Sequence, residues 1–132
     1  MKTIKVTGAI IQNDNNFLIG RRGKDEKSAG MWEFPGGKLE EGETPKECIR
    51  RELKEELNID AEIGELFFSY TYDYPHVSYE LYFFKVNSFF GEPVKYVHDK
   101  LKWEKLKNFY KYEFLPGDGP LIDKLISETN QR

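Results

Sequence analysis

The stretch Gly37–Ile59, GKLEEGETPKECIRRELKEELNI, contains the strongest local structural signal in the chain and decides the fold. Thr44 is a preferred N-cap residue, Pro45 suits the first helical position, and Glu47 completes a capping box three residues after the cap. The pattern predicts a helix that begins after Thr44 and runs to about Leu57. The asparagine that follows can adopt the left-handed conformation that ends many helices.

The predicted helix has an acidic stripe beside an apolar one. Glu52, Glu55 and Glu56 share an arc of roughly 100° on a helical wheel. The adjoining apolar stripe consists of Ile49, Leu53 and Leu57. Like charges at i, i+4 repel, more strongly as solvent is excluded. Either the acidic face is solvated and neutralised by Arg50, Arg51 and Lys54, or it lines a cleft and binds a cation. Carboxylates in this number suit Mg²⁺, with Mn²⁺ as an alternative.

Composition limits the classes of protein that the chain can belong to. Its 132 residues fit one domain over residues 1–132. Hydrophobic residues at 39% and charged residues at 33% exclude a disordered or membrane protein. No apolar run approaches the ~20 residues of a membrane span, and no secretory signal is present, so a soluble cytoplasmic protein is expected.

Cysteine count and charge exclude two further classes. The single cysteine, Cys48, has no CxxC or Cys/His partner, which argues against structural zinc and an oxidising compartment and favours a small buried hydrophobe. The net charge of −3 gives no basic field for duplex binding, so a nucleic-acid polymer is not an expected partner. A small anionic ligand remains compatible with this charge.

Strands are expected on both sides of the helix. Lys2–Ile11 and Phe17–Ile19 are predicted to form a hairpin across an Asn-Asp-Asn-Asn turn, followed by a loop over Gly20–Phe34 with a short strand near Trp32. Later strands are predicted at Leu66–Tyr74, Tyr79–Val86 and Lys100–Leu106. A last helix follows Gly119-Pro120, with Leu121, Ile122, Leu125 and Ile126 on its apolar face. This order favours α/β layers around a mixed sheet.

The helix and its flanks resemble the Nudix box, Gx₅Ex₇REUxEExGU, in which U is an apolar residue. The matching positions are Gly37, Glu43, Arg51, Glu52, Leu53, Glu55, Glu56 and Ile59. Only the late glycine of the box differs, and Asn58 in its place can adopt the same backbone conformation. A likeness to the MutT group continues through Trp32–Lys38, Gly91–Pro93 and Phe114–Leu121, and so covers most of the chain.

The resemblance implies a Nudix-type α/β/α sandwich around a mixed β-sheet and a Mg²⁺-dependent hydrolase. The implied metal ligands are Glu52, Glu55, Glu56 and the carbonyl of Gly36. These glutamates are also the expected catalytic residues, with Glu52 as the leading general base or water orienter. Glu43 and Arg51 are expected to hold the helix geometry through a bidentate pair, the alternative being an exposed salt bridge of little value.

The resemblance implies the substrate-binding residues less specifically than it implies the metal ligands. Arg22 and Lys38 are candidates to bind phosphates, and Arg22, Glu33, Phe34 and Asp118 stand where MutT-like proteins meet the nucleotide. Asp118 is the candidate for the base edge, where a carboxylate would only accept hydrogen bonds. Open alternatives are a surface charge for Arg22, a core residue for Phe34 and a helix cap for Asp118. The many aromatic residues between positions 67 and 84 could line a base pocket or simply fill the core.

Two departures bear on mechanism and substrate. Many relatives carry a glutamate six residues before the late-strand Trp103, where Val97 stands here, so His98 or Asp99 would have to take its role. Relatives that act on oxidised guanine nucleotides tend to carry a basic residue near Val77, which this chain lacks apart from the adjacent histidine. The general base therefore stays open, and an assignment to 8-oxo-dGTP is weakened.

The expected function is hydrolysis of a nucleoside triphosphate to the monophosphate and pyrophosphate, with oxidised nucleotides such as 8-oxo-dGTP as substrates and a DNA-repair role in cleaning the nucleotide pool. The alternatives are CTP or modified pyrimidine nucleotides, then ADP-ribose or dinucleoside polyphosphates. A non-catalytic nucleotide-binding module on the same fold is disfavoured by the intact glutamates. The sequence leaves monomer and homodimer open.

Overall fold

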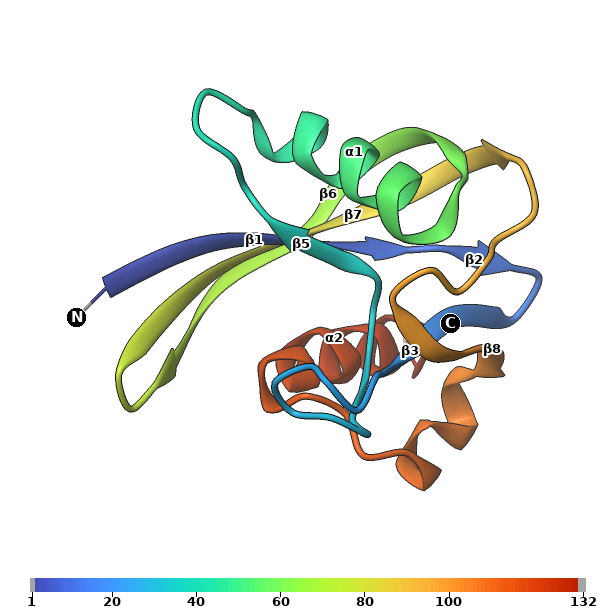
Figure 1. Cartoon of the computed structure of the whole chain (residues 1–132). Coiled ribbons are helices and arrows are strands. Elements are labelled where there is room, and N and C mark those ends of the chain that lie inside the picture. Colours follow the sequence, from blue (N-terminus) through green and yellow to red (C-terminus); the bar gives the residue numbers. More distant parts are fainter. Residues whose placement is uncertain (1, 131–132) are drawn as a thin grey trace.

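The computed structural model describes residues 2–130, in which two helices lie on opposite sides of the strands. Helix α1 (Pro45–Leu57) covers one face, and helix α2 (Gly119–Asn130) lies on the other, as Figure 1 shows. The expected α/β layers with flanking helices are confirmed. No helix within residues 2–130 is long and apolar enough to cross a membrane.

The strands form two sheets rather than the single mixed sheet that was expected. The mixed sheet has the order β5 (Gly36–Lys38), β1 (Lys2–Ile10), β7 (Val77–Phe90) and β6 (Asp60–Tyr74). Strands β1 and β7 run parallel, whereas β1–β5 and β6–β7 are antiparallel. The antiparallel sheet contains β2 (Gln12–Asn13), β3 (Asn16–Arg22), β4 (Trp32–Glu33) and β8 (His98–Lys105).

Two 3₁₀ turns connect the antiparallel sheet to α2. They are η1 (Leu106–Lys111) and η2 (Pro116–Asp118). The segment between them lies beside β4, because the amide of Trp32 donates to the carbonyl of Glu113 at 2.8 Å and the amide of Leu115 donates to the carbonyl of Trp32 at 3.0 Å. The start of α2 is therefore fixed to the strand that leads into the Gly36-Gly37 loop.

Helix α1 has the predicted bounds and caps. The Thr44 hydroxyl accepts from the amide of Glu47 at 3.1 Å, and the Glu47 carboxylate accepts from the amide of Thr44 at 2.9 Å. At the other end Asn58 has φ 56° and ψ 40°, the left-handed conformation expected from its place in the sequence. The capping-box prediction is confirmed.

The predicted loop at 20–34 is wrong at its beginning, and the strands predicted at Leu66–Tyr74 and Tyr79–Val86 are too short. Gly20, Arg21 and Arg22 continue β3, where they pair with β8. Local sequence indicated a loop because the segment is charged and contains glycine, but pairing on both sides of β3 satisfies its backbone groups. The residues Gly36–Lys38, for which no strand was predicted, form the short edge strand β5.

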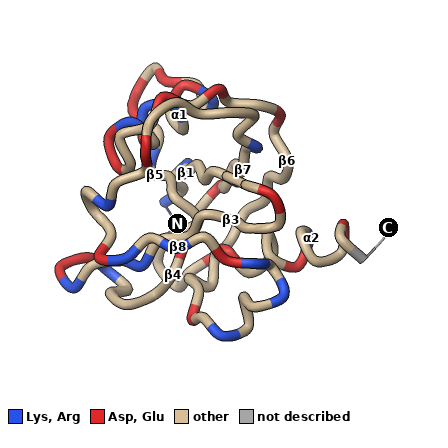
Figure 2. Tube along the Cα trace, turned by 90° about the vertical axis from the view of Figure 1, so that its right-hand side faces the viewer, with Lys and Arg blue, Asp and Glu red and all other residues tan. Residues whose placement is uncertain are grey.

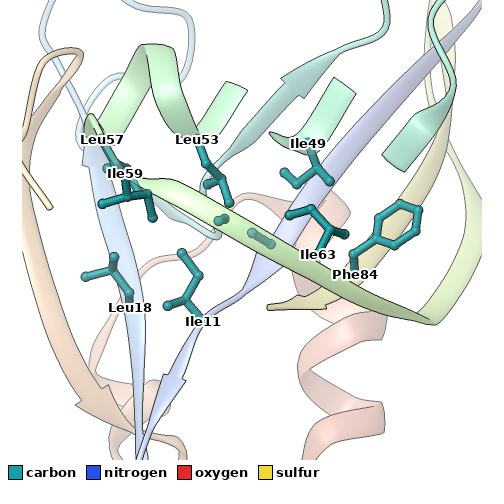
Figure 3. Packing of buried hydrophobic residues seen from close by; sticks show 10 residues of the cluster. Ile11, Leu18, Ile49, Leu53, Leu57, Ile59, Ile63 and Phe84 are labelled. Atoms are coloured by element: carbon teal, nitrogen blue, oxygen red, sulfur yellow. The ribbon is translucent and has the colours of Figure 1, made fainter. Parts of the chain in front are cut away.

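Two apolar clusters fill the space between the layers. One lies under α1 and contains Ala9, Ile11, Leu18, Ile49, Leu53, Leu57, Ile59, Ala61, Ile63 and Phe84, most of them labelled in Figure 3. The other includes the inner face of α2 and contains Ile10, Phe17, Ile19, Phe34, Leu81, Phe83, Phe109, Leu121 and Leu125. The apolar stripe predicted for α1 is confirmed, because all three of its residues are fully buried.

Candidate functional site

Glu52 lies against the glycine loop that precedes α1. Its side chain is 15% exposed, and one carboxylate oxygen accepts from Nη1 of Arg51 at 2.8 Å. A Cβ atom at Gly37 would lie 2.4 Å from the Glu52 carboxylate carbon, so this approach requires glycine. Burial raises the pKa of Glu52 above its ordinary value. Glycine at position 37 thus lets the Glu52 carboxylate pack directly against the loop.

Glu56 also lies against the glycine loop, and its pKa is strongly raised. Its carboxylate accepts from the amide of Gly36 at 3.3 Å. Burial, and next the charges of Glu33 and Glu52, raise the pKa of Glu56 to about 9. Glu55 is exposed and lies 3.0 Å from Arg51 through its Oε1 atom. The helix therefore presents two partly buried carboxylates and one solvated one.

This donor set fits a divalent cation. Among residues 2–130 no three acidic, histidine or cysteine side chains form a complete cage by themselves. Mg²⁺ seldom needs one, because it typically takes one or two carboxylates together with water and substrate phosphate oxygens. Ionised Glu52 and Glu56 side by side need a compensating positive charge that faces both of them. A Mg²⁺ ion bound here would supply that charge.

Arg51 ties α1 to the segments around it. Its guanidinium donates to both oxygens of Glu43, at 2.7 Å from Nε and 2.9 Å from Nη2, and to the Lys38 carbonyl at 3.1 Å. This contact lowers the pKa of Glu43 to about 2. The predicted bidentate pair is present, and acidic and basic residues are interleaved along α1 in Figure 2.

Cys48 belongs to the first turn of α1, on the buried side of the helix, and is fully buried. Its sulfur is 3.3 Å from the Thr7 hydroxyl. Burial raises the pKa of the Cys48 thiol to about 11. The expectation of a small buried hydrophobe is confirmed.

Three strands of the antiparallel sheet bring together Arg22, Glu33 and His98. The Glu33 carboxylate lies 2.9 Å from Nη1 of Arg22 on one side and 2.9 Å from Nε2 of His98 on the other. The Nδ1 atom of His98 is buried and has no hydrogen-bond partner within the described residues. Of the two substitutes considered for Val97, His98 reaches this cluster.

In the described part of the chain, the side chains of Asp99 and Val97 form no hydrogen bond or ion pair with the cluster of Arg22, Glu33 and His98. Asp99 pairs with Arg21 at 2.7 Å, and both of these side chains are partly solvated. Val97 is 45% exposed. Arg22 also donates to the carbonyl of Lys27 at 2.6 Å. Its guanidinium therefore binds both Glu33 and the loop that follows β3. The cluster was not predicted as a unit, because its members come together only through strand pairing.

Phe34 and Asp118 meet at the far end of β4. Phe34 is 4% exposed and packs in the second cluster, as its core interpretation predicted. Its amide donates to Oδ2 of Asp118 at 3.1 Å. Asp118 itself is 7% exposed, and burial, then the charge of Glu33, raises its pKa to about 8.

Because its pKa is raised, the Asp118 carboxyl is mostly protonated at neutral pH. This changes the interpretation of the residue that was made from the sequence. The protonated carboxyl both donates and accepts hydrogen bonds, whereas an ionised one only accepts. Its described hydrogen bond is to Phe34, so the alternative role as a cap of α2 finds no support. Of the two predicted phosphate-binding residues, Lys38 has an exposed side chain on β5 and Arg22 lies beside Glu33.

Comparisons with known proteins agree on one family. A model of the NUDIX domain matches residues 2–125. An 8-oxo-dGTP diphosphatase of Escherichia coli (strain K12) is 37% identical over 126 residues, which cover 95% of this chain and 98% of the relative. A CTP pyrophosphohydrolase of the same strain is 34% identical over 127 residues, 96% of this chain and 94% of the relative.

Solved structures extend the likeness to three dimensions. The solution structure of the E. coli ORF135 protein has a TM-score of 0.88 and 33% identity, and it covers 100% of this chain and 94% of its own. A MutT protein from Methanosarcina mazei Go1 has a TM-score of 0.85 and 25% identity, with coverage of 99% and 97%. The chain belongs to the Nudix hydrolase family. Within that family it is MutT-like.

Proposed function

We propose that the chain is a Mg²⁺-dependent nucleoside triphosphate pyrophosphohydrolase that releases a nucleoside monophosphate and pyrophosphate, with oxidised nucleotides such as 8-oxo-dGTP as its substrates. The observation that carries the proposal is the pair of partly buried carboxylates, Glu52 and Glu56, held against Gly36 and Gly37. The names of the bacterial relatives support the same activity and include two substrate classes.

Each side chain has a proposed role at the phosphate end. When bound, Mg²⁺ lowers the pKa of a coordinated water and neutralises charge on the phosphates. Glu52, Glu55, Glu56 and the Gly36 carbonyl would hold it. Arg51 fixes one oxygen of Glu52, which leaves the other to orient water or accept its proton.

The neighbours of these carboxylates have proposed roles as well. Arg22 and Lys38 supply cations for the phosphate oxygens. Glu43 and Arg51 keep α1 in register with the glycine loop through their two-point contact. Glu33 holds Arg22 in place by an interaction of 2.9 Å.

The base end involves Asp118 and the backbone of Phe34. A neutral carboxyl can accept from N1–H of a guanine base and donate to its O6 atom. It can equally accept from the amino group of cytosine and donate to N3. The neutral Asp118 therefore also favours a second candidate function, hydrolysis of CTP or modified pyrimidine nucleotides, which the 34% identity to a CTP pyrophosphohydrolase supports.

The test is pyrophosphate release with Mg²⁺ from 8-oxo-dGTP, dGTP, CTP, 5-methyl-dCTP, ADP-ribose and a dinucleoside tetraphosphate. Glu56→Gln should lower turnover at least about a hundredfold, and Glu41→Gln, an exposed acid of the same motif, should retain it. Selective turnover of 8-oxo-dGTP supports the first candidate and selective turnover of cytidine nucleotides the second. Absence of turnover on the whole panel would overturn both and favour a binding module.

A further inference from the structure

Two tyrosines of β6 hold the turn that precedes α2. The hydroxyl of Tyr70 donates to the carbonyl of Gly117 at 2.5 Å. The hydroxyl of Tyr74 accepts from the amide of the same glycine at 3.1 Å. Both polar groups of Gly117, the residue immediately before Asp118, are therefore bound by phenol groups from one strand.

The backbone on the other side of this peptide is fixed as well. The amide of Asp118 donates to the carbonyl of Leu115 at 3.0 Å, and the amide of Leu115 donates to the carbonyl of Trp32 at 3.0 Å. A Cβ atom on Gly117 would lie 3.2 Å from the Tyr74 hydroxyl, so a larger residue would displace this phenol. The position of Asp118 thus depends on β6 as much as on β4.

The phenol rings are themselves constrained. Tyr70 stacks on Phe83, with ring centroids 5.8 Å apart, and Tyr74 packs edge-on against Tyr79 at 5.4 Å. Burial raises the pKa of Tyr70 and of Tyr74, so both phenols keep their protons at neutral pH. Tyr70 therefore remains a hydrogen-bond donor throughout the working range.

We propose that Tyr70 and Tyr74 are positioning residues for base selectivity, which place the Asp118 carboxyl opposite the amide of Phe34. This inference rests on the proposed function, because it requires Asp118 to meet the base. Within the described residues neither phenol contacts the carboxylates of α1. Loss of either hydroxyl should therefore change discrimination between bases and KM far more than kcat on the preferred nucleotide.

The experiment compares Tyr70→Phe and Tyr74→Phe with Tyr72→Phe. Tyr72 lies between them on the same face of β6, and its hydroxyl has no hydrogen bond within the described residues. For each variant kcat and KM are measured with 8-oxo-dGTP, dGTP and CTP, and Tm is recorded. The ratio of kcat/KM between the best and second-best nucleotide should fall about threefold to tenfold in the two flanking variants and stay unchanged in Tyr72→Phe.

Asp118→Ala, measured on the same panel, separates the two possible failures. If this variant keeps the ratio of wild type, Asp118 does not recognise the base, and both the base-end part of the proposed function and this inference are overturned. If it loses the ratio while Tyr70→Phe and Tyr74→Phe keep it, the inference alone is overturned. An equal change in Tyr72→Phe would also overturn it, because general packing would then explain the result.

Discussion

The Arg51 guanidinium binds several groups at once. Its partners include the carboxylates of Glu43, Glu52 and Glu55 and the carbonyl of Lys38. A lysine at this position keeps the charge but loses the planar fork that reaches several acceptors at once. The residue therefore acts through geometry more than through charge.

For Arg51→Lys we expect kcat to fall about tenfold, because groups that orient metal ligands typically contribute this much. The Mg²⁺ concentration for half-maximal activity should rise in parallel. Arg50→Lys, an exposed neighbour on the same helix, serves as the control. Equal kinetics for the two variants would show that a positive charge alone suffices at Arg51. Steady-state assays over a Mg²⁺ series give both quantities.

Asp118 links stability to pH. In the unfolded chain its carboxyl ionises near the ordinary pKa of 3.8, whereas in the fold burial raises the pKa to about 8. The folded state therefore loses stability relative to the unfolded state as the pH rises between these values, and the loss levels off above pH 8. Asp118→Asn removes this ionisation and keeps an acceptor for the amide of Phe34.

We therefore expect the Tm of Asp118→Asn to exceed that of the wild type by an amount that grows from pH 4 to pH 8, reaching roughly 3 °C or more. The two proteins should have similar Tm values near pH 4. Thermal unfolding followed by circular dichroism over this range measures the difference. A gap that does not vary with pH would contradict a buried, protonated Asp118.

Some side-chain contacts could be predicted from sequence, and others could not. The Glu43–Arg51 pair was expected from the resemblance to the Nudix box, and its two residues lie only eight positions apart, one in α1 and one just before it. The contact of Glu33 with His98 depends on the register of three strands, which local sequence does not encode. The neutral state of Asp118 depends on burial by residues far along the chain.

At the scale of elements, α1 was predictable and the strands were less so. A helix with an N-cap, a capping box and a left-handed end has its bounds encoded in adjacent residues. Strand β6 extends from Asp60, six residues before the predicted start, because pairing with β7 satisfies its backbone in spite of three register irregularities. Sheet pairing thus extends the strand over residues that the sequence did not predict to be part of it.

The capping box can be tested by Thr44→Ala. Loss of the hydroxyl that binds the amide of Glu47 should lower the free energy of unfolding by about 1 kcal/mol. Thr44→Ser should keep most of that stability. Chemical denaturation measures both values. If Thr44→Ala and Thr44→Ser unfold at the same denaturant concentration, the cap contributes little to α1.

At the scale of the whole molecule, two apolar clusters support the two parts of the proposed site. The first cluster supports the acidic helix, and the second supports the turn with Asp118 and the helix that follows. Leu53 of α1 and Leu121 of α2 are both fully buried, one in each cluster. They form a matched pair of substitution sites for separating the proposed metal-binding end from the proposed base-binding end.

Leu53→Ala and Leu121→Ala should each destabilise the fold by about 3 kcal/mol. Leu53→Ala should lower kcat for all nucleotides by a similar factor, because it loosens the helix that carries Glu52. Leu121→Ala should instead change the ratio of kcat/KM between nucleotides, because it lies three residues after Asp118. Denaturation and the substrate panel together test this division. Identical kinetic profiles for the two variants would refute it.

The buried position of the chain's one cysteine makes it a native reporter of helix opening. Cys48 is enclosed between α1 and the strand beneath it, and its thiol ionises only at high pH. A thiol-specific reagent can therefore react with it only in molecules whose helix α1 has transiently moved away from the strand beneath it. At a fixed pH, the labelling rate divided by that of an unstructured peptide gives the equilibrium constant for this opening. Slower labelling on addition of Mg²⁺ and nucleotide would reveal how far ligands clamp α1, without any introduced probe.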